Sequence, residues 1–441
     1  MFKLRLPPIL LCSIATFLLT VTPSPGASVV TAQPIPEHTA LSTEDFLNHL
    51  GVNTHLDGLT QSDPWNTDAV LVGTQLNYLG MRLDRDWAHS ADADKKWKEV
   101  QKAWSLYGRF WTSIDEAGPQ YQRDVLAYEE TIYQAYPGLI YAMGGPNEPD
   151  NTYPQSQGAT LPDSALVQQS LYSWAHLQGR NIPVSQMEFG SGWTATNHWQ
   201  GDYNPGDTGI HQNYTAGPAE LGAAHTYLHM PGQRPVDVLK QVRLLATLTT
   251  PGKPVAHTEI GAYRSANFSA ALFSQDLVMG AFDSFAAGDA AYIVYGLQDS
   301  GPENTYGFYT YPGNIPHEAA RDFHTLTTLL KSDTGRYGPG SAPSFVPTSL
   351  AVSFTNLSTS HLVMQKPTGQ FVIADWSEQA MTGLEHEEID TIQFLHAVST
   401  LRVYDVETGA EPIQSLHNVK QCVLHMKPSD TYLLVLDTDR T

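Results

Sequence analysis

Short apolar segments recur between residues 51 and 296, and each ends in polar or aromatic residues before a loop and an amphipathic segment. Apolar runs of four to eight residues predict strands, and apolar positions every three to four residues predict helices. Strands that alternate with helices favour a parallel sheet with crossover helices. The predicted strands cover 51–55, 78–83, 109–114, 139–143, 184–189, 223–227, 254–259 and 291–296.

Amphipathic helices fit between these strands, and a short helix with Ser42 as its cap precedes the first of them. Eight strand–helix units in about 250 residues match a (β/α)₈ barrel in size and order. An open doubly wound sheet is the structural alternative, but no Gly-x-Gly-x-x-Gly follows the first strand. We therefore predict a barrel over residues 42–340. Its clearest helices cover 68–77, 121–136, 163–179, 236–249 and 269–287.

The hydrophobic pattern changes after Gly340, where prolines punctuate the chain and apolar residues begin to alternate with polar ones. A period of two with turn signals such as Pro367-Thr368-Gly369 indicates antiparallel strands. We predict an antiparallel β-sandwich over residues 341–441, so that the whole chain belongs to the α/β class. The predicted strands cover 349–354, 361–365, 371–376, 401–405, 421–426 and 431–436.

The first residues have the pattern of a secretory signal peptide, with Lys3 and Arg5 ahead of an apolar run from Ile9 to Val21. This run is short for a bilayer span, although an uncleaved anchor is the alternative. Cleavage after Ala32 or near Gly26 fits the small residues there. We predict that residues 1–32 are signal and lead, and that the mature protein is secreted or periplasmic.

Composition narrows the classes of function and partner. Hydrophobic residues make up 41% of the chain and charged residues 16%, as in a globular protein with a large core. The net charge of −21 makes nucleic acid and anionic membranes poor partners. Once the signal is removed, Cys422 is the single cysteine, so we expect no internal disulfide and a buried thiol. Nothing in the composition favours one oligomeric state.

A stiff turn carries the most informative carboxylate. Glu148 stands between Asn147 and Pro149, after two glycines that end the predicted fourth strand. Because a proline disfavours the helical region for the residue before it, we expect Glu148 in extended geometry. A carboxylate held so firmly at a strand end indicates catalysis, with a structural turn residue as the alternative.

Catalytic groups of a barrel stand at the carboxyl ends of its strands. Two carboxylates there, Glu148 on the fourth strand and Glu259 on the seventh, lie on opposite sides of the ring and can converge across its mouth. Such a pair suits cleavage of a glycosidic bond, with retention at about 5–5.5 Å and inversion at roughly 6.5–9.5 Å. The other polar residues at these ends are His55, Arg82, Asn147, Glu188, His225, Tyr227, His257, Tyr295 and Gln298.

Asn147-Glu148-Pro149 on strand four, with Glu259 on strand seven, resembles the clan A retaining glycoside hydrolases over residues 45–335. The added sandwich makes families 39, 5 and 79 the nearest, and we favour a family 39-like enzyme. The resemblance implies that Glu148 is the acid/base and Glu259 the nucleophile of a double displacement on a carbohydrate substrate. It implies no cofactor, and no cysteine pair accompanies the histidines to suggest zinc.

The resemblance also implies roles around this pair. Asn147 would bind the sugar 2-hydroxyl, Arg82 and Tyr227 would hold Glu259, and His55 and His225 would line the sugar subsite. The eighth strand lacks the tryptophan common in the clan, so the sugar platform would be Tyr295, or Trp193 or Trp199 from the loop after strand five.

Several alternatives stay open from the residues alone. Glu188 is either a hydrogen-bonding support or a third catalyst, and Arg82 is either a partner of the nucleophile or an ordinary buried ion pair. Each of His55, His225 and His257 is either a sugar contact or a core histidine. The alternatives for function are a non-catalytic carbohydrate-binding protein and a transglycosylase. Xylosides, glucosides, galactosides and uronides are all possible substrates.

Overall fold

The computed structural model places residues Ile35–Thr441 in one compact unit. Three predicted features lie outside the described residues: the signal segment 1–32, the domain boundary near residue 341, and the side chains of His55, Trp193 and Trp199. No helix among the residues that the structure describes is both long and apolar enough to cross a membrane. The described residues are 34–54, 68–87, 99–100, 109–114, 119–135, 138–148, 161–188, 217–227, 234–261, 269–299, 306–311, 314–332, 345–356, 358–379 and 385–437.

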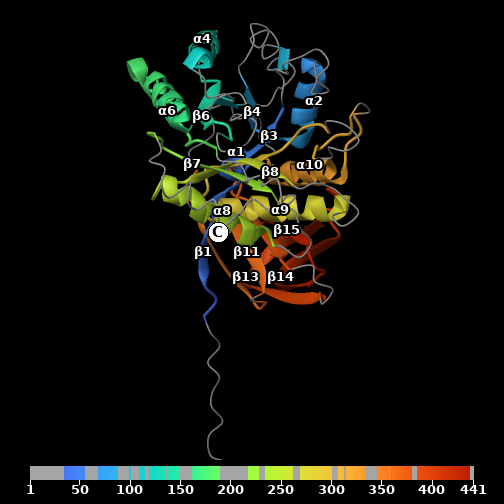
Figure 1. The fold of residues 1–441 in the computed structure, drawn as a ribbon. Helices are drawn as coiled ribbons and strands as arrows, with labels where there is room; N and C mark the ends of the chain where they lie inside the picture. The colour runs from blue at the N-terminus through green and yellow to red at the C-terminus, as the bar shows by residue number, and fades with distance from the viewer. Residues whose placement is uncertain are drawn as a thin grey trace, which may run out of the picture. The chain divides into compact units, whose positions relative to one another are not determined.

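A parallel sheet of seven strands forms most of a barrel, in the order β6-β5-β4-β3-β9-β8-β7 (Figure 1). Neighbouring strands pair in parallel throughout this sheet. Its strands are β3 (Leu50–Asn53), β4 (Leu83–Trp87), β5 (Arg109–Ile114), β6 (Ile140–Pro146), β7 (Gly222–Tyr227), β8 (Val255–Gly261) and β9 (Ala291–Val294).

Residues 184–188 take the eighth position and join β6 to β7. They form parallel bridges to β6 at Met143↔Val184 and Asn147↔Glu188, and a parallel bridge at Ser185↔Leu221 beside β7. The backbone N–H of Ser185 donates to the carbonyl of Met143 over 2.8 Å. The ring is therefore closed, and the predicted (β/α)₈ fold is confirmed.

Seven α-helices of the described chain accompany these strands, together with a short 3₁₀-helix, η1 (Leu177–Gly179). Ser42 caps α1 as predicted, because its side chain accepts the backbone N–H of Asp45. Helix α2 ends at Gly80, whose φ of +68° closes the helix in a left-handed conformation. The helices are α1 (Thr43–His49), α2 (Ala69–Leu79), α4 (Pro119–Ala135), α6 (Leu161–Ala175), α8 (Pro235–Thr249), α9 (Ala270–Ala286) and α10 (Glu318–Leu330).

The barrel interior is apolar toward the amino ends of the strands and polar toward their carboxyl ends. A separate buried cluster combines small and branched residues from four strands, among them Leu83 on β4, Ala142 on β6 and Ile293 on β9. Further along β4 and β8, Arg85 and Glu259 are buried as well. Because a buried charge needs a partner, the carboxyl ends of the strands must bring such side chains together.

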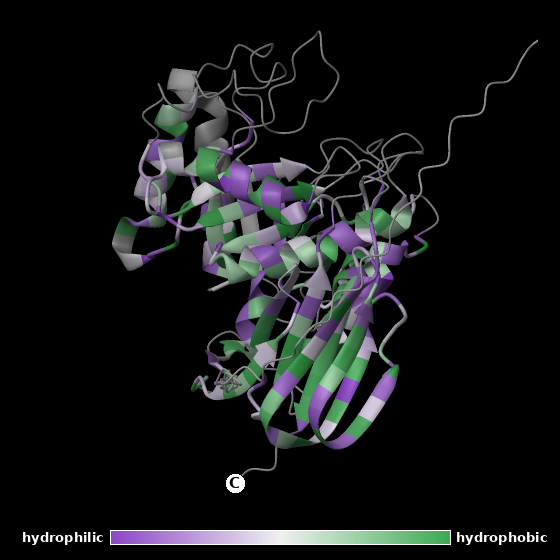
Figure 2. Ribbon diagram, turned by 90° about the horizontal axis from the view of Figure 1, so that it is seen from below, coloured by the Kyte–Doolittle hydropathy of each residue, from purple (hydrophilic) through white to green (hydrophobic). Residues whose placement is uncertain are grey.

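The remaining strands form an eight-stranded β-domain, ordered β1-β10-β13-β15-β12-β11-β2, with β14 paired to β13. Hydrophobic and hydrophilic residues alternate along its long strands (Figure 2). Cys422 is buried in its core, as predicted. Its strands are β1 (Glu37–Thr39), β2 (Leu41–Ser42), β10 (Ser349–Phe354), β11 (Thr359–Gln365), β12 (Phe371–Ser377), β13 (Glu388–Asp405), β14 (Gln414–Met426) and β15 (Thr431–Asp437).

The segment just before the barrel belongs to this β-domain, which the sequence did not predict. Strand β1 pairs with β10, and β2 pairs with β11, so residues 37–42 form its two outer strands. The chain thus forms β1 and β2 of the β-domain first, then the barrel, and then the remaining strands of the β-domain. Pairing across more than 300 residues leaves no local pattern in a three-residue strand, which explains why the sequence did not predict it.

Helix α9 joins the barrel to the β-domain. The ring of Phe282 on α9 stacks on that of Trp376 on β12, with centroids 5.3 Å apart and planes 25° apart. Both side chains are fully buried. The backbone N–H of Val236 on α8 also donates to Glu378, just beyond β12. One hydrophobic core therefore runs through both parts.

The carboxyl group of Asp322, on α10, gives this region a pH dependence. It is buried and accepts a hydrogen bond from Ser274 on α9. Burial raises the pKa of Asp322 to about 6, although the bond from Ser274 lowers it. The folded protein therefore binds more protons here than the unfolded chain between about pH 4 and 6, so stability is lost as pH rises through this window.

We predict that Asp322→Asn flattens the pH dependence of stability. Its unfolding free energy should fall less steeply than that of the native chain around pH 5, by up to about 1.4 kcal/mol per pH unit, the value for one proton. Urea unfolding at pH 4, 5, 6 and 7 measures this slope. Asp237→Asn, on the exposed side of α8, is the control. Equal slopes for native and Asp322→Asn would contradict the prediction.

Candidate active site

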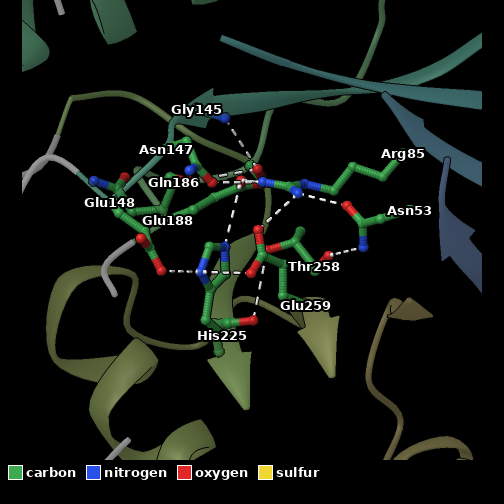
Figure 3. Close-up of polar contacts among 12 residues, drawn as sticks. Asn53, Arg85, Gly145, Asn147, Glu148, Gln186, Glu188, His225, Thr258 and Glu259 are labelled. Atoms are coloured by element: carbon green, nitrogen blue, oxygen red, sulfur yellow. Dashed lines mark hydrogen bonds and ion pairs between the residues drawn. The ribbon is translucent and has the colours of Figure 1, made fainter. Parts of the chain in front are cut away.

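Glu148 lies two residues beyond the end of β6 and points toward the barrel mouth. Its carboxylate lies 2.9 Å from Nδ1 of His225, and its side chain is 24% exposed (Figure 3). The backbone is not extended as predicted, because φ is +40°. Its N–H donates to the carbonyl of Glu188 over 2.6 Å. This bond to the neighbouring strand holds a left-handed conformation, which also avoids the right-handed helical region disfavoured before proline.

Glu259 stands on β8 with both carboxylate oxygens hydrogen-bonded. Oε2 accepts from the hydroxyl of Tyr227 over 2.5 Å, and Oε1 accepts from the guanidinium of Arg85 over 2.9 Å. The side chain is 8% exposed, so one edge reaches the mouth. Burial and the charge of Glu259 raise the pKa of Tyr227 well above its usual value. Tyr227 therefore stays a hydrogen-bond donor, and its bond together with that from Arg85 fixes the position of Glu259.

The arginine of the site is Arg85, not Arg82. Helix α2 continues through Leu79, so β4 begins at Leu83, five residues later than the predicted strand. The residue that reaches the mouth is accordingly Arg85, which is fully buried. Arg82 instead pairs with Glu44 on α1 over 2.7 Å, away from the other site residues. The prediction that Arg82 holds Glu259 is therefore wrong.

Arg85 connects four side chains (Figure 3). One terminal nitrogen donates to Glu259 and to Asn53 Oδ1 over 2.6 Å. The other donates to Asn147 Oδ1 over 2.6 Å and to Glu188 over 2.5 Å. A planar guanidinium with donors in a fixed fork is suited to such multiple bonding. Since Oδ1 of Asn147 is engaged, its NH₂ group is the donor that Asn147 can offer to a substrate.

Asn53 was not among the predicted site residues. At the end of β3, its Nδ2 donates to the backbone carbonyls of Thr258 and Val294, so it ties β3 to β8 and β9. These bonds orient its Oδ1 toward Arg85. In the sequence, Asn53 lies at the polar end of the first predicted strand, two residues before His55, which was the residue predicted to line the site there.

His225, on β7, lies between carboxylates. Nδ1 is 2.9 Å from Glu148 and 3.5 Å from Glu259, while Nε2 is 3.7 Å from Glu188. Burial lowers the pKa of His225, but the charge of Glu259 and the hydrogen bonds with Glu148 and Glu188 outweigh burial and raise it to about 10. An imidazolium that donates from Nδ1 to Glu148, with Nε2 facing the charge of Glu188, is the form this geometry favours.

Glu188 is the third buried carboxylate. Its side chain is fully buried, with Arg85 at 2.5 Å. Burial raises the pKa of Glu188, but the charges of Arg85 and His225 outweigh burial and lower it. A fully buried carboxylate paired with a guanidinium has no free face for a substrate, so its position fits the supporting role among the two alternatives.

Tyrosines lie near the end of β9, the strand whose sequence lacks the tryptophan that is common in the clan. Tyr295 follows β9, and its ring centroid lies 6.1 Å from that of Tyr227 and 5.9 Å from that of Tyr306. Tyr306, which the sequence did not single out, is 5.8 Å from Tyr227. Aromatic rings grouped beside a carboxylate pair can offer a sugar their faces or edges.

His257 lies apart from the mouth. It is fully buried, with Nδ1 2.9 Å from the hydroxyl of Thr226 and Nε2 3.0 Å from the carboxylate of Asp289. Arg243 completes this network with two bonds to Asp289. His257 is thus placed as a core histidine.

A metal has one candidate set of ligands in the described chain. Ligand atoms of Glu148, His225 and Glu259 lie within 4.8 Å of one another. His225 has a raised pKa, however, and a protonated imidazole has no lone pair for a metal. The same distances suit hydrogen bonds from an imidazolium to the side chains of Glu148 and Glu259.

Comparisons with solved structures agree with the architecture. The chain is similar to a family 39 glycoside hydrolase from the gut symbiont Bacteroides cellulosilyticus WH2, with a TM-score of 0.59 and 13% identity over 90% of this chain and 82% of that one. The GH39 enzyme from Xanthomonas axonopodis pv. citri has a TM-score of 0.56 and 13% identity, over 94% and 99%. A GH30 endoxylanase from Clostridium papyrosolvens C71 has a TM-score of 0.54 and 12% identity, over 91% and 98%.

No protein-family model matches the sequence, and no curated protein does. Identities this low show a shared fold and no more. The chain therefore has the barrel and β-domain architecture of clan A glycoside hydrolases, the group that its Asn-Glu-Pro strand end resembles.

Proposed function

We propose that the protein is a retaining glycoside hydrolase that cleaves β-glycosidic bonds of an oligo- or polysaccharide. The observation that carries this proposal is the convergence of Glu148 and Glu259, which bring ligand oxygens within 4.8 Å of each other across the barrel mouth. Retaining enzymes hold their two carboxyl groups about 5–5.5 Å apart, while inverting enzymes need room for a water between them. The fold shared with glycoside hydrolases supports the same reaction class.

In the first step, the Glu259 carboxylate attacks the anomeric carbon and the bond to the leaving oxygen breaks. Glu148 gives its proton to that oxygen, and Glu259 becomes a glycosyl ester. Arg85 and Tyr227 hold the Glu259 carboxylate in position before the attack. The negative charge of Glu259 favours the protonated form of its neighbour Glu148, which the acid role requires.

In the second step, water attacks the ester from the opposite face. Glu148 takes the proton of that water, and the Glu259 carboxylate leaves. Because the ester is neutral, the charge that had favoured protonated Glu148 is gone, and the His225 imidazolium beside it then favours the ionised base. The NH₂ group of Asn147 is oriented by Arg85 to bind the sugar hydroxyl next to the reacting carbon.

The N-terminal segment supports a secreted or periplasmic location, because Lys3 and Arg5 precede the apolar run from Ile9 to Val21. The acidic surface, with a net charge of −21, fits a neutral carbohydrate better than a polyanion.

Aryl β-glycosides test the proposal. We expect the native protein to release nitrophenol from at least one of the β-xyloside, β-glucoside, β-galactoside and β-glucuronide, and to leave the matching α-glycosides intact. The Glu148→Gln/Glu259→Gln double variant, purified identically, controls for contaminating hydrolases. Turnover of none of these β-glycosides, or equal turnover by the double variant, would contradict the proposal.

A further inference from the structure

Glu188 occupies the centre of the hydrogen-bond network without facing the mouth. Its carbonyl accepts the backbone N–H of Glu148, and its own N–H donates to the carbonyl of Pro146. The main chain of Glu188 thus fixes the unusual backbone of Glu148. Its carboxylate meets Arg85 at 2.5 Å and His225 Nε2 at 3.7 Å, with all three side chains fully buried (Figure 3).

The two cations that Glu188 contacts also contact the proposed catalytic pair. Arg85 bonds to Glu259, and Nδ1 of His225 bonds to Glu148 and lies 3.5 Å from Glu259. Interactions between charges strengthen as water is excluded. The charge of Glu188 therefore reaches both catalytic carboxylates, each through one intermediate cation.

The net charge of the groups at this site indicates that one of the three carboxyl groups carries a proton. Three carboxylates and two cations of the described residues meet here, so the formal charge is −1 unless one carboxylate carries a proton. Arg85 hydrogen-bonds to Glu188 and Glu259 and stabilises their charged forms, so we place the proton on Glu148, which hydrogen-bonds to the imidazole of His225. Among the described residues, the charged groups in contact with His225 are Glu148, two residues beyond β6, Glu188, and Glu259 on β8.

We propose that Glu188 is a positioning residue that keeps Glu148 protonated and Glu259 ionised by holding Arg85 and His225 between the three carboxylates. Glu188 does not touch the substrate. This inference rests on the proposed glycosidase reaction for its consequence in catalysis, but its electrostatic part concerns the protein alone. The raised pKa of His225 agrees with it, since the bond with Glu188 contributes to that shift.

Glu188→Gln removes the charge and keeps the shape. Without that charge, two cations balance two carboxylates, and Glu148 ionises more readily. We expect the basic limb of the kcat/KM profile, measured on the aryl β-glycoside hydrolysed fastest, to move down by about one pH unit or more. Glu188→Asp keeps the charge but shortens the side chain by one methylene. The basic limb of its profile should lie between those of the native protein and Glu188→Gln. Glu44→Gln, which removes the partner of Arg82 outside the site, is the control and should leave the limb in place.

A purely structural role predicts a different result. It would lower kcat or stability in Glu188→Gln with an unmoved pH profile, and that outcome would overturn the proposal. If Glu188→Gln does not fold, Glu188→Asp carries the test: a basic limb moved to lower pH supports the role, and an unmoved limb overturns it.

A titration of His225 separates this proposal from the proposed function. Imidazole ¹⁵N spectra of histidine-labelled protein, with His225→Gln to assign the signal, should show both nitrogens of native His225 protonated at pH 8. In Glu188→Gln, the proton should leave at least about one pH unit lower. This readout needs no substrate, so it holds even if no glycoside is cleaved. An identical titration in native protein and variant would overturn the proposal.

Discussion

Glu259→Ala should abolish hydrolysis, lowering kcat/KM by about 10⁴-fold or more, because Glu259 is the group on which the glycosyl ester is proposed to form. The carboxylate is held by Arg85 and Tyr227, and its loss leaves a space at the mouth for a small anion. Added azide should then attack the anomeric carbon from the side that Glu259 vacated. The product expected from a β-glycoside is the α-glycosyl azide, identified by NMR.

Glu148→Ala should behave differently from Glu259→Ala. Loss of the general acid costs about 10²–10⁴-fold with a poor leaving group, and far less with a dinitrophenyl group that needs no proton. Azide should attack the glycosyl ester on Glu259 and give the β-glycosyl azide. Glu44→Ala controls for loss of a carboxylate elsewhere on the barrel. Undiminished hydrolysis by Glu259→Ala, or the opposite azide anomers, would contradict the two roles.

The second large effect is expected at Arg85. Arg85→Lys should lower kcat/KM by about 10²–10³-fold, because one ammonium cannot reach the four side chains that the guanidinium joins. Asn147 would lose its orientation, and Glu188 would be left as a buried carboxylate with a poorer partner. We therefore also expect a loss of stability, of up to about 3–5 kcal/mol if no new ion pair forms.

Arg82→Lys is the matched control for Arg85→Lys. Arg82 lies three residues earlier in the chain, is partly exposed, and pairs with Glu44. Partly exposed pairs contribute about 0–1 kcal/mol, so activity and stability should stay near native. Kinetics and urea unfolding of both variants measure the contrast. Equal losses in the two variants would show that Arg85 has no special place in the site.

The contrast between Arg82 and Arg85 shows what the sequence could predict. Strand existence and order followed from apolar runs, and Glu148, His225, Tyr227 and Glu259 fell at or near strand ends that were placed within three residues. The second strand was misplaced, because its apolar start, Tyr78-Leu79, is the last turn of α2. Gly80 carried the missing signal: a glycine after an apolar-periodic segment is a common helix end. Moving the strand beyond it makes Arg85 the polar residue at the mouth.

Other features depended on contacts between distant segments. The positive φ of Glu148 follows from a bond to Glu188, forty residues away, which opposes the extended geometry that Pro149 alone suggests. The joining of β1 and β2 to the β-domain likewise has no local pattern. The role of Asn53 required knowing that the ends of β3, β8 and β9 meet. In each case the local sequence allows several conformations, and contacts between distant segments select one of them.

The most direct test of the account is to trap the intermediate on the nucleophile. A 2-deoxy-2-fluoro β-glycosyl fluoride of the sugar found in the aryl glycoside panel forms the ester quickly and releases it slowly. Native protein should lose activity with time and gain the mass of one fluoroglycosyl group. Peptide mass spectrometry should place that group on Glu259. A label on Glu148 or Glu188, or turnover of the probe with no covalent adduct, would contradict a double displacement through Glu259.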